Sequence, residues 1–280
     1  MELYYVKLMV FFVLASMIFL IGYLYLRYRK KQRLKMIEKI PFKPEHRKFL
    51  HKTPHYDSLL DVDKQKIERS IIRFVYTKTF IGVKMEITDE IKIVTAFYAC
   101  LLLLHKETSQ CYDALQTIIV YPSPVVLKDV RENGGIYTKE DFIIDGQSSN
   151  DTVILVWHDA KQEAYHLRHD NVVIHEFAHE IDFMDGEVDG VPPLEASKYH
   201  EWTSIFYDEY EKLHAVAMKD REWGKYKLLG SYAATNEAEF FAVVTERFFE
   251  SPHSLYVHFP ELYKELKDFY EIDTLTLVSK

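Results

Sequence analysis

The feature that most constrains the architecture is an uncharged run of 19 residues near the amino terminus, Leu8 to Leu26. A run of this length crosses the hydrocarbon core of a bilayer as a helix. Only Lys7 and the terminal amine precede it, whereas six basic residues follow it: Arg27, Arg29, Lys30, Lys31, Arg33 and Lys35. Basic residues mark the cytoplasmic end of a membrane span. We therefore expect a retained single-pass anchor with the rest of the chain facing the cytosol.

Two alternatives to this anchor are disfavoured by the same residues. A cleaved signal peptide carries its charges before the apolar run, and here they come after it. A helix that packs on a globular domain is usually apolar on one face, whereas this run is apolar all round and ends in a basic cluster.

The remaining sequence has the composition of a globular domain. The 280 residues are 48% hydrophobic and 28% charged. A net charge of −8 argues against a nucleic-acid binder, which needs a basic face. Cys100 and Cys111 have neither C-x-x-C nor zinc-ribbon spacing and are expected to be reduced thiols. We expect an anchor with a basic juxtamembrane segment (1–36), a proline-containing connector (37–60) and one domain (61–280).

Hydrophobic periodicity predicts both helices and strands in that domain. A loop containing Asn133-Gly134-Gly135 is expected between the two predicted strands, and the pattern is helical again after Asn171. The predicted helices are Asp61 to Phe80, Asp89 to Lys106, Leu194 to Met218, Glu237 to Glu250 and Pro260 to Tyr270, and the predicted strands are Thr117 to Tyr121 and Thr152 to Trp157.

The strongest chemical signal is His175-Glu176-Phe177-Ala178-His179. On a helix, residues four apart lie on one face, so His175 and His179 can offer two imidazole nitrogens to one zinc ion. Glu176 then lies beside the metal, where it can act as a general base. The alternative is an amphipathic helix with two hydrogen-bonded histidines, which the apolar flanks suit equally well.

A catalytic zinc site normally has a third protein ligand, and the residues leave two candidates. Asp185 lies ten residues after His175, beyond a turn at which Asp182 stands where a glycine would be favoured. Glu239 lies near the start of a later helix. Because Asn236 and Glu239 have capping-box spacing, Glu239 has the alternative role of capping its own helix.

Three separated segments carry a resemblance to a known family. The stretch HEFAHEIDFMDGEVDGVPPL from His175, the stretch SYAATNEAEFFAVVTERFFESP from Ser231 and the stretch GQSSNDTVILVWHDA from Gly146 resemble the MtfA-like (Mlc titration factor A) family of zinc metallopeptidases. The resemblance runs from about Lys39 to the end of the chain. It implies an α+β fold, a single zincin-like domain of the gluzincin type that is similar to the catalytic domain of anthrax lethal factor, here preceded by one transmembrane helix.

The resemblance also implies roles for individual residues. It makes His175, His179 and Glu239 the ligands of one Zn²⁺ per chain and Glu176 the general base, and it places the Tyr232 phenol where it can stabilise an oxyanion. The implied substrate is a peptide or protein. The alternative function is a zinc-containing regulatory protein that captures a partner at the membrane, such as a transcriptional regulator, with little or no peptidase activity.

Other polar residues near these motifs have two interpretations each. Asp182 either orients a ligand histidine or is a helix-end carboxylate, and Glu246 either holds a ligand histidine or is a surface charge, the default we adopt. His158, His166 and His169 lack metal spacing and are expected at the surface or behind the site. Thr152 to Trp157 is either a core strand or the edge strand to which a substrate adds.

Overall fold

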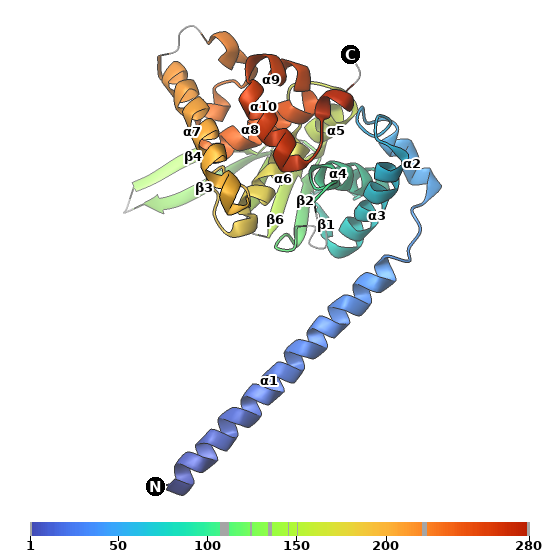
Figure 1. Cartoon of the computed structure of the whole chain (residues 1–280), viewed down its shortest axis with the longest axis vertical. Helices are drawn as coiled ribbons and strands as arrows, with labels where there is room; N and C mark the ends of the chain where they lie inside the picture. The colour runs from blue at the N-terminus through green and yellow to red at the C-terminus, as the bar shows by residue number, and fades with distance from the viewer. Residues whose placement is uncertain are drawn as a thin grey trace. The chain divides into compact units, whose positions relative to one another are not determined.

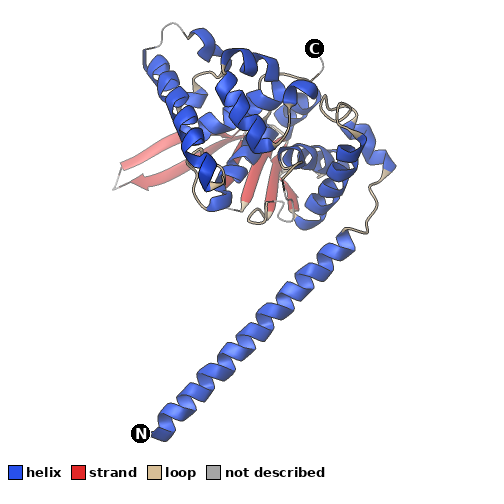
Figure 2. Cartoon of the chain, in the orientation of Figure 1, coloured by secondary structure: helices blue, strands red, loops and turns tan. Residues whose placement is uncertain are grey.

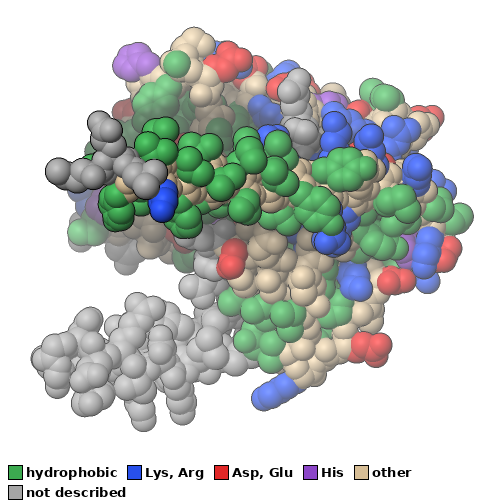
Figure 3. All heavy atoms as spheres, turned by 90° about the horizontal axis from the view of Figure 1, so that it is seen from below, with side chains coloured by type: hydrophobic (Ala, Val, Ile, Leu, Met, Phe, Trp, Pro, Cys, Tyr) green, Lys and Arg blue, Asp and Glu red, His purple; other side chains and the backbone are tan. Residues whose placement is uncertain are grey.

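The computed structural model describes residues 2–106, 112–123, 125–133, 136–144, 146–149, 151–219 and 223–278. The chain forms two compact units, residues 1–42 and 43–280 (Figures 1 and 2). The first unit contains one helix, α1 (Glu2–Ile37). Its segment Tyr4–Ile37 is long and apolar enough to cross a membrane by length and composition. Hydrophobic side chains gather along α1 and are exposed (Figure 3).

The second unit contains a four-stranded sheet in the order β1-β2-β6-β5. Strands β1 (Thr79–Gly82), β2 (Thr117–Tyr121) and β6 (Thr152–Val156) are parallel, and β5 (Gly146–Ser149) pairs antiparallel with β6. The prediction for β2 is confirmed. Strand β6 lies inside the sheet and is not an edge strand. The edge beside it is formed by β5, which the sequence patterns did not indicate.

A second, two-stranded sheet stands where a loop was expected. Strands β3 (Val125–Asn133) and β4 (Ile136–Ile144) pair antiparallel and project from the rest of the unit (Figure 1). Gly134 and Gly135 lie outside the described residues. The sequence patterns predicted a loop in this region and missed both strands.

Helices make up most of the second unit. The α-helices are α2 (Pro44–Leu50), α3 (Asp61–Thr77), α4 (Asp89–Leu102), α5 (Trp157–Tyr165), α6 (Val172–Asp182), α7 (Ala196–Lys219), α8 (Glu237–Glu250), α9 (Pro252–His258) and α10 (Pro260–Tyr270). Short 3₁₀ helices are η2 (Phe183–Asp185), η3 (Gly224–Leu228), η4 (Tyr232–Ala234) and η5 (Thr274–Thr276). The predicted bounds of α8 and α10 are confirmed, and those of α7 differ by two residues or fewer.

Two predicted helices are too long. The helix expected to reach Phe80 ends at Thr77, because Lys78 is extended and the next residues pair with β2. That pairing satisfies the backbone of both strands and places the Phe80 ring 6.4 Å from that of Phe74 in the core. The helix expected to reach Lys106 ends at Leu102. Cys100 near its end is buried, and Cys111 lies outside the described residues.

Residues 43–60, expected in the connector, belong to the second unit. The Arg47 guanidinium donates two hydrogen bonds to the Glu68 carboxylate, at 2.6 and 2.8 Å. The Tyr56 hydroxyl donates to the same carboxylate at 2.7 Å, and His55 is fully buried. These contacts fix α2 and the following turn on α3, so the folded unit begins earlier than the proline spacing suggested.

Two aromatic clusters hold the helices that matter for the site. On one side of α6, Phe177 packs against Phe74 and Tyr112, with ring centroids 5.6 and 5.0 Å apart. On α8, Phe240 and Phe241 pack against Phe206 of α7. Each such buried ring contributes about 1.5–3 kcal/mol of burial free energy. The helices α6 and α8 also contact each other directly, so their facing side chains are held in a rigid setting.

Candidate metal centre

Residues next to α6 in the sequence determine where this helix begins and where the chain turns after it. Asn171 is its N-cap, and the side-chain oxygen accepts a hydrogen bond from the Ile174 amide at 3.2 Å. Its apolar residues other than Val172 are buried, so the helix is enclosed on most sides. The left-handed turn after it falls at Gly186, where φ is +102°, and not at Asp182.

The helix α8 has a cap that leaves Glu239 available for other contacts. The Asn236 side chain accepts a hydrogen bond from the Glu239 amide at 2.9 Å. The Glu239 carboxylate contacts the two histidines of α6. The capping role considered for this side chain is therefore not the one that the structure shows.

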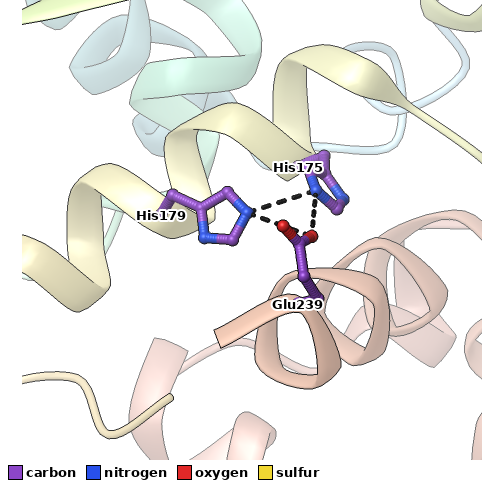
Figure 4. A group of neighbouring side chains, drawn as sticks. All are labelled: His175, His179 and Glu239. Atoms are coloured by element: carbon purple, nitrogen blue, oxygen red, sulfur yellow. Dashed lines mark hydrogen bonds and ion pairs between the residues drawn. The ribbon is translucent and has the colours of Figure 1, made fainter. Parts of the chain in front are cut away.

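Three side chains from these two helices converge on one point (Figure 4). His175 Nε2 lies 3.0 Å from Glu239 Oε2, and His179 Nε2 lies 3.4 Å from the same oxygen. The two Nε2 atoms are 3.2 Å apart. All the ligand atoms lie within 4.8 Å of one another, a spacing that fits a single metal ion. Two imidazole nitrogens and a carboxylate oxygen are the donor types of a catalytic zinc site.

Burial and hydrogen bonds shift the pKa values of His175 and Glu239 in opposite directions. Burial lowers the pKa of His175, but hydrogen bonds to Glu239 and Glu246 outweigh burial and raise it to about 10. Burial works against ionisation of Glu239, yet its hydrogen bonds to both histidines hold the pKa well below the usual range. Glu239 is therefore an ionised carboxylate that contacts both histidines. A metal ion requires this ionised form of its carboxylate ligand.

Glu176 and Tyr232 border the cluster. Glu176 is 4% exposed, and its Oε2 has no hydrogen-bond partner among the described residues. Burial raises its pKa to about 8, although the positive charge of His175 acts in the other direction. The Tyr232 ring lies 5.8 Å from the His175 ring and is 58% exposed. Burial of the phenol and the nearby Glu239 carboxylate both raise its pKa.

Glu246 is buried behind the cluster and is not a surface charge, so our default for it was wrong. It is 4% exposed, and its Oε1 lies 2.7 Å from His175 Nδ1. Its Oε2 accepts from the Asn171 backbone amide at 2.7 Å. One carboxylate therefore ties the first turn of α6 to the imidazole that faces Glu239.

Asn171 is the residue at this site that the sequence patterns missed. Its side-chain amide donates to the buried Glu250 carboxylate at 2.7 Å, while its side-chain oxygen caps α6. The available signal was an asparagine directly before a helical apolar pattern, which is an N-cap signature.

The remaining candidate residues lie away from the cluster. Asp185 is exposed, and its carboxylate accepts from the Glu187 amide at 3.2 Å. Asp182 is fully buried but accepts from the Gly190 amide at 2.9 Å, so it fixes the loop after η2 and does not orient a histidine. The side chains of His158, His166 and His169 are exposed, in agreement with the surface expectation.

The chain resembles several known proteins in sequence. A model of the glucose-regulated metallo-peptidase M90 family matches residues 26–271. An uncharacterised protein of Synechocystis is 36% identical over 229 residues, 79% of this chain and 81% of the relative. Mlc titration factor A of Serratia proteamaculans is 31% identical over 61% of this chain and 66% of the relative, and that of Yersinia pestis is 32% identical over 60% and 62%. The chain thus spans a little under two thirds of these Mlc titration factors.

Among solved structures, a Bacteroides caccae protein described as a candidate zinc-binding metallo-peptidase aligns with 78% of this chain and 91% of its own. The identity is 14% and the TM-score 0.34, which is too low to support a conclusion. The family match covers most of the chain and includes both helices that carry the cluster. This protein belongs to the MtfA-like family of metallopeptidases, the glucose-regulated metallo-peptidase M90 family.

Proposed function

We propose that this protein is a membrane-anchored zinc metallopeptidase that hydrolyses peptide bonds, with Glu176 as its general base. The observation that carries the proposal is the convergence of His175, His179 and Glu239 beside a buried carboxylate. Membership of a metallopeptidase family supports it.

The residues present fit one zinc ion per chain. Their donor atoms are two nitrogens and one oxygen, and a catalytic zinc keeps a fourth position open for water or substrate. Among the described residues, Oε2 of Glu176 has no hydrogen-bond partner, and this is a second point in favour. A buried carboxylate oxygen without a donor is costly unless a ligand or water contacts it. Zinc bound there lowers the pKa of a water molecule and polarises the substrate carbonyl.

The protein side chains then handle protons and charge. Glu176 accepts a proton from the attacking water and delivers it to the leaving amine. A nearby cation stabilises the ionised form of this carboxylate, which burial otherwise disfavours. The Tyr232 phenol stays protonated at neutral pH and donates a hydrogen bond to the oxyanion that develops on the carbonyl.

The sheet offers a place for the peptide backbone. Strand β5 is the edge of the four-stranded sheet and contacts α6, the helix that carries both histidines. An extended substrate that adds to this edge by main-chain pairing would run alongside the metal-binding helix. This role, first considered for β6, passes to β5 because β6 is flanked on both sides.

The N-terminal helix supports a location of the protein at a membrane surface. The uncharged run of 19 residues gives a helical length of about 28 Å, close to the thickness of a hydrocarbon core. Tyrosines stand near both ends, as membrane interfaces favour: Tyr4, Tyr5, Tyr23, Tyr25 and Tyr28. The basic residues that follow support a cytosolic orientation of the second unit.

The test separates catalysis from binding. Full-length chain in detergent micelles, loaded with zinc, should cleave peptides from a mixed library, and Glu176→Gln should abolish cleavage while it keeps the metal. Cleavage that survives in Glu176→Gln refutes the role of that residue. A wild-type chain that binds zinc, cleaves nothing and captures a transcriptional regulator would support the alternative, a regulatory binding protein. We include this outcome because the name of the related Mlc titration factors refers to a titration function.

A further inference from the structure

Arg247 on α8 is a buried arginine beside the metal centre that the proposed mechanism does not use. Its side chain is 8% exposed. Arginine is almost never buried to this degree unless it is paired. It directly follows Glu246, the carboxylate that contacts His175. The partners of this guanidinium therefore bear on the geometry of the site.

The guanidinium is held by acceptors from two other segments of the chain. Its Nε donates to the Leu228 carbonyl oxygen at 2.7 Å, at the end of η3. Its terminal nitrogens donate to the His169 carbonyl oxygen and, at 2.9 Å, to the Asp170 carboxylate. Nη1 also lies 3.7 Å from Glu246 Oε2. A planar guanidinium with bonds in three directions has a fixed position.

The Glu246 carboxylate lies between this guanidinium and the metal centre. Its Oε2 is the oxygen near Arg247, and the same atom accepts from the Asn171 backbone amide at 2.7 Å. Its Oε1 lies 2.7 Å from His175 Nδ1. Because a carboxylate is planar, contacts that fix one of its oxygens also set the direction of the other. One carboxylate thus connects Arg247 to the imidazole that faces Glu239 (Figure 4).

Arg247 also fixes the chain where α6 begins. His169 and Asp170 directly precede Asn171, the N-cap of α6, and both accept from Arg247. The Asn171 carbonyl oxygen accepts from the His175 backbone amide at 3.0 Å. The first turn of α6, which ends at a residue of the metal centre, is therefore tied to α8.

The surrounding charges favour a permanent cation at this position. Burial raises the pKa of Glu163 to about 7 and that of Glu250 to about 8, and the negative charge of Glu246 adds to both shifts. Glu246 thus lies among carboxyl groups that disfavour further negative charge. Arginine stays protonated in proteins, so Arg247 supplies a counter-charge that does not depend on pH.

We propose that Arg247 is a positioning residue of the metal centre, which fixes the Glu246 carboxylate and the start of α6 and so orients the His175 imidazole towards the metal. Hydrogen-bond partners behind a ligand histidine set the orientation of its ring. Arg247 lies one contact further out than such a partner. This inference rests on the zinc site of the proposed function and does not require peptide cleavage.

Zinc binding by the full-length chain in detergent micelles is the direct test. Affinity is measured by competition with a chromogenic chelator, and far-UV circular dichroism shows which variants are folded. Arg247→Met removes the guanidinium and keeps an unbranched side chain in its place. It should lower the zinc affinity about ten-fold, the lower end of the loss expected when support behind a metal ligand is removed. Unchanged affinity in the folded variant would overturn the proposal.

Arg47→Met is the matched control. The Arg47 guanidinium also donates two hydrogen bonds, but to Glu68, where α2 meets α3. Its loss weakens the fold away from Glu246, so the zinc affinity should stay within about two-fold of wild type. An equal loss of affinity in both variants would show that Arg247 acts only on folding, and the proposal would then be wrong.

A double-mutant cycle shows whether Arg247 acts through Glu246. Two residues that act through one contact have effects that do not add. In a Glu246→Gln chain, Arg247→Met should therefore change the zinc affinity by less than about two-fold. A ten-fold loss that persists in this background would refute the route through Glu246.

Arg247→Lys covers the case in which Arg247→Met does not fold. A lysine keeps the positive charge, but its ammonium cannot serve the three acceptors of the planar guanidinium, so the zinc affinity should fall about three-fold. Wild-type affinity in this variant would count against the proposal. A wild-type chain that binds zinc but cleaves no peptide would refute the peptidase function alone, because every measurement on Arg247 is one of metal binding.

Discussion

The contact between Glu246 and His175 predicts a loss of metal affinity in Glu246→Gln. Glu246 accepts from two N–H groups, the His175 Nδ1 and the Asn171 backbone amide, both at 2.7 Å. A glutamine has one acceptor oxygen, so its NH₂ group must face one of these donors. Removing such a partner behind a metal ligand typically costs 10–100-fold in metal affinity, about 1.4–2.7 kcal/mol. A further loss of about 1–3 kcal/mol in folding stability is expected from the unsatisfied buried donor.

The assay is a zinc titration of the full-length chain against a chromogenic chelator, with far-UV circular dichroism to show that each variant is folded. Glu250→Gln is the matched control. Glu250 lies one turn further along α8, is equally buried and accepts from Asn171, but its pKa is raised to about 8 by burial. A neutral side chain is therefore close to its native state, and zinc affinity should stay within two-fold of wild type. Wild-type affinity in Glu246→Gln, or an equal loss in both variants, would refute the reasoning.

Three shorter predictions follow from other contacts. In equilibrium dialysis, Glu239→Ala should lower the zinc affinity at least 100-fold, whereas Asp185→Ala should leave it unchanged, because Asp185 is exposed and outside the cluster. Zinc binding that is retained in Glu239→Ala and lost in Asp185→Ala would reverse the ligand assignment. Burial raises the pKa of Asp182 to about 7, so the folded state keeps a proton on this carboxyl that the unfolded state releases near pH 4. The stabilisation that comes from this difference in pKa is fully present below pH 4 and is lost as the pH rises towards 7. Thermal melts of Asp182→Asn should thus decline less than wild type from pH 5 to pH 8, and parallel curves would contradict this. A reporter fused after Lys280 should be active on the cytosolic side of the membrane, and an external signal would reverse the proposed orientation.

Local chemistry made much of the site predictable. Helical spacing alone puts His175 and His179 on one face, since that relation depends only on residues four apart. The bounds of α8 and α10 also follow from local caps: Asn236 before α8 and Pro260 at the first turn of α10. The position of Glu246 beside the site could have been predicted, because it lies seven residues after Glu239 and a helix returns to the same face after two turns.

Other features depended on which segments meet in space. Residues 79 and 80 were predicted as helix, and only their pairing with β2 shows that they begin a strand. Strand order alone shows that the edge of the sheet is β5 and not β6. Backbone pairing of this kind is set by partners far along the chain, so no local pattern encodes it.

The sequence by itself determined two helices of this protein: one apolar enough to cross a membrane, and one with two histidines one turn apart. Both rest on periodicity within a single segment. The tertiary structure decided that Glu239, 64 residues after His175, completes the cluster, and that Asp185, ten residues after it, does not. It did so because α6 and α8 bury facing surfaces against each other, and that packing brings together atoms that sequence distance cannot relate.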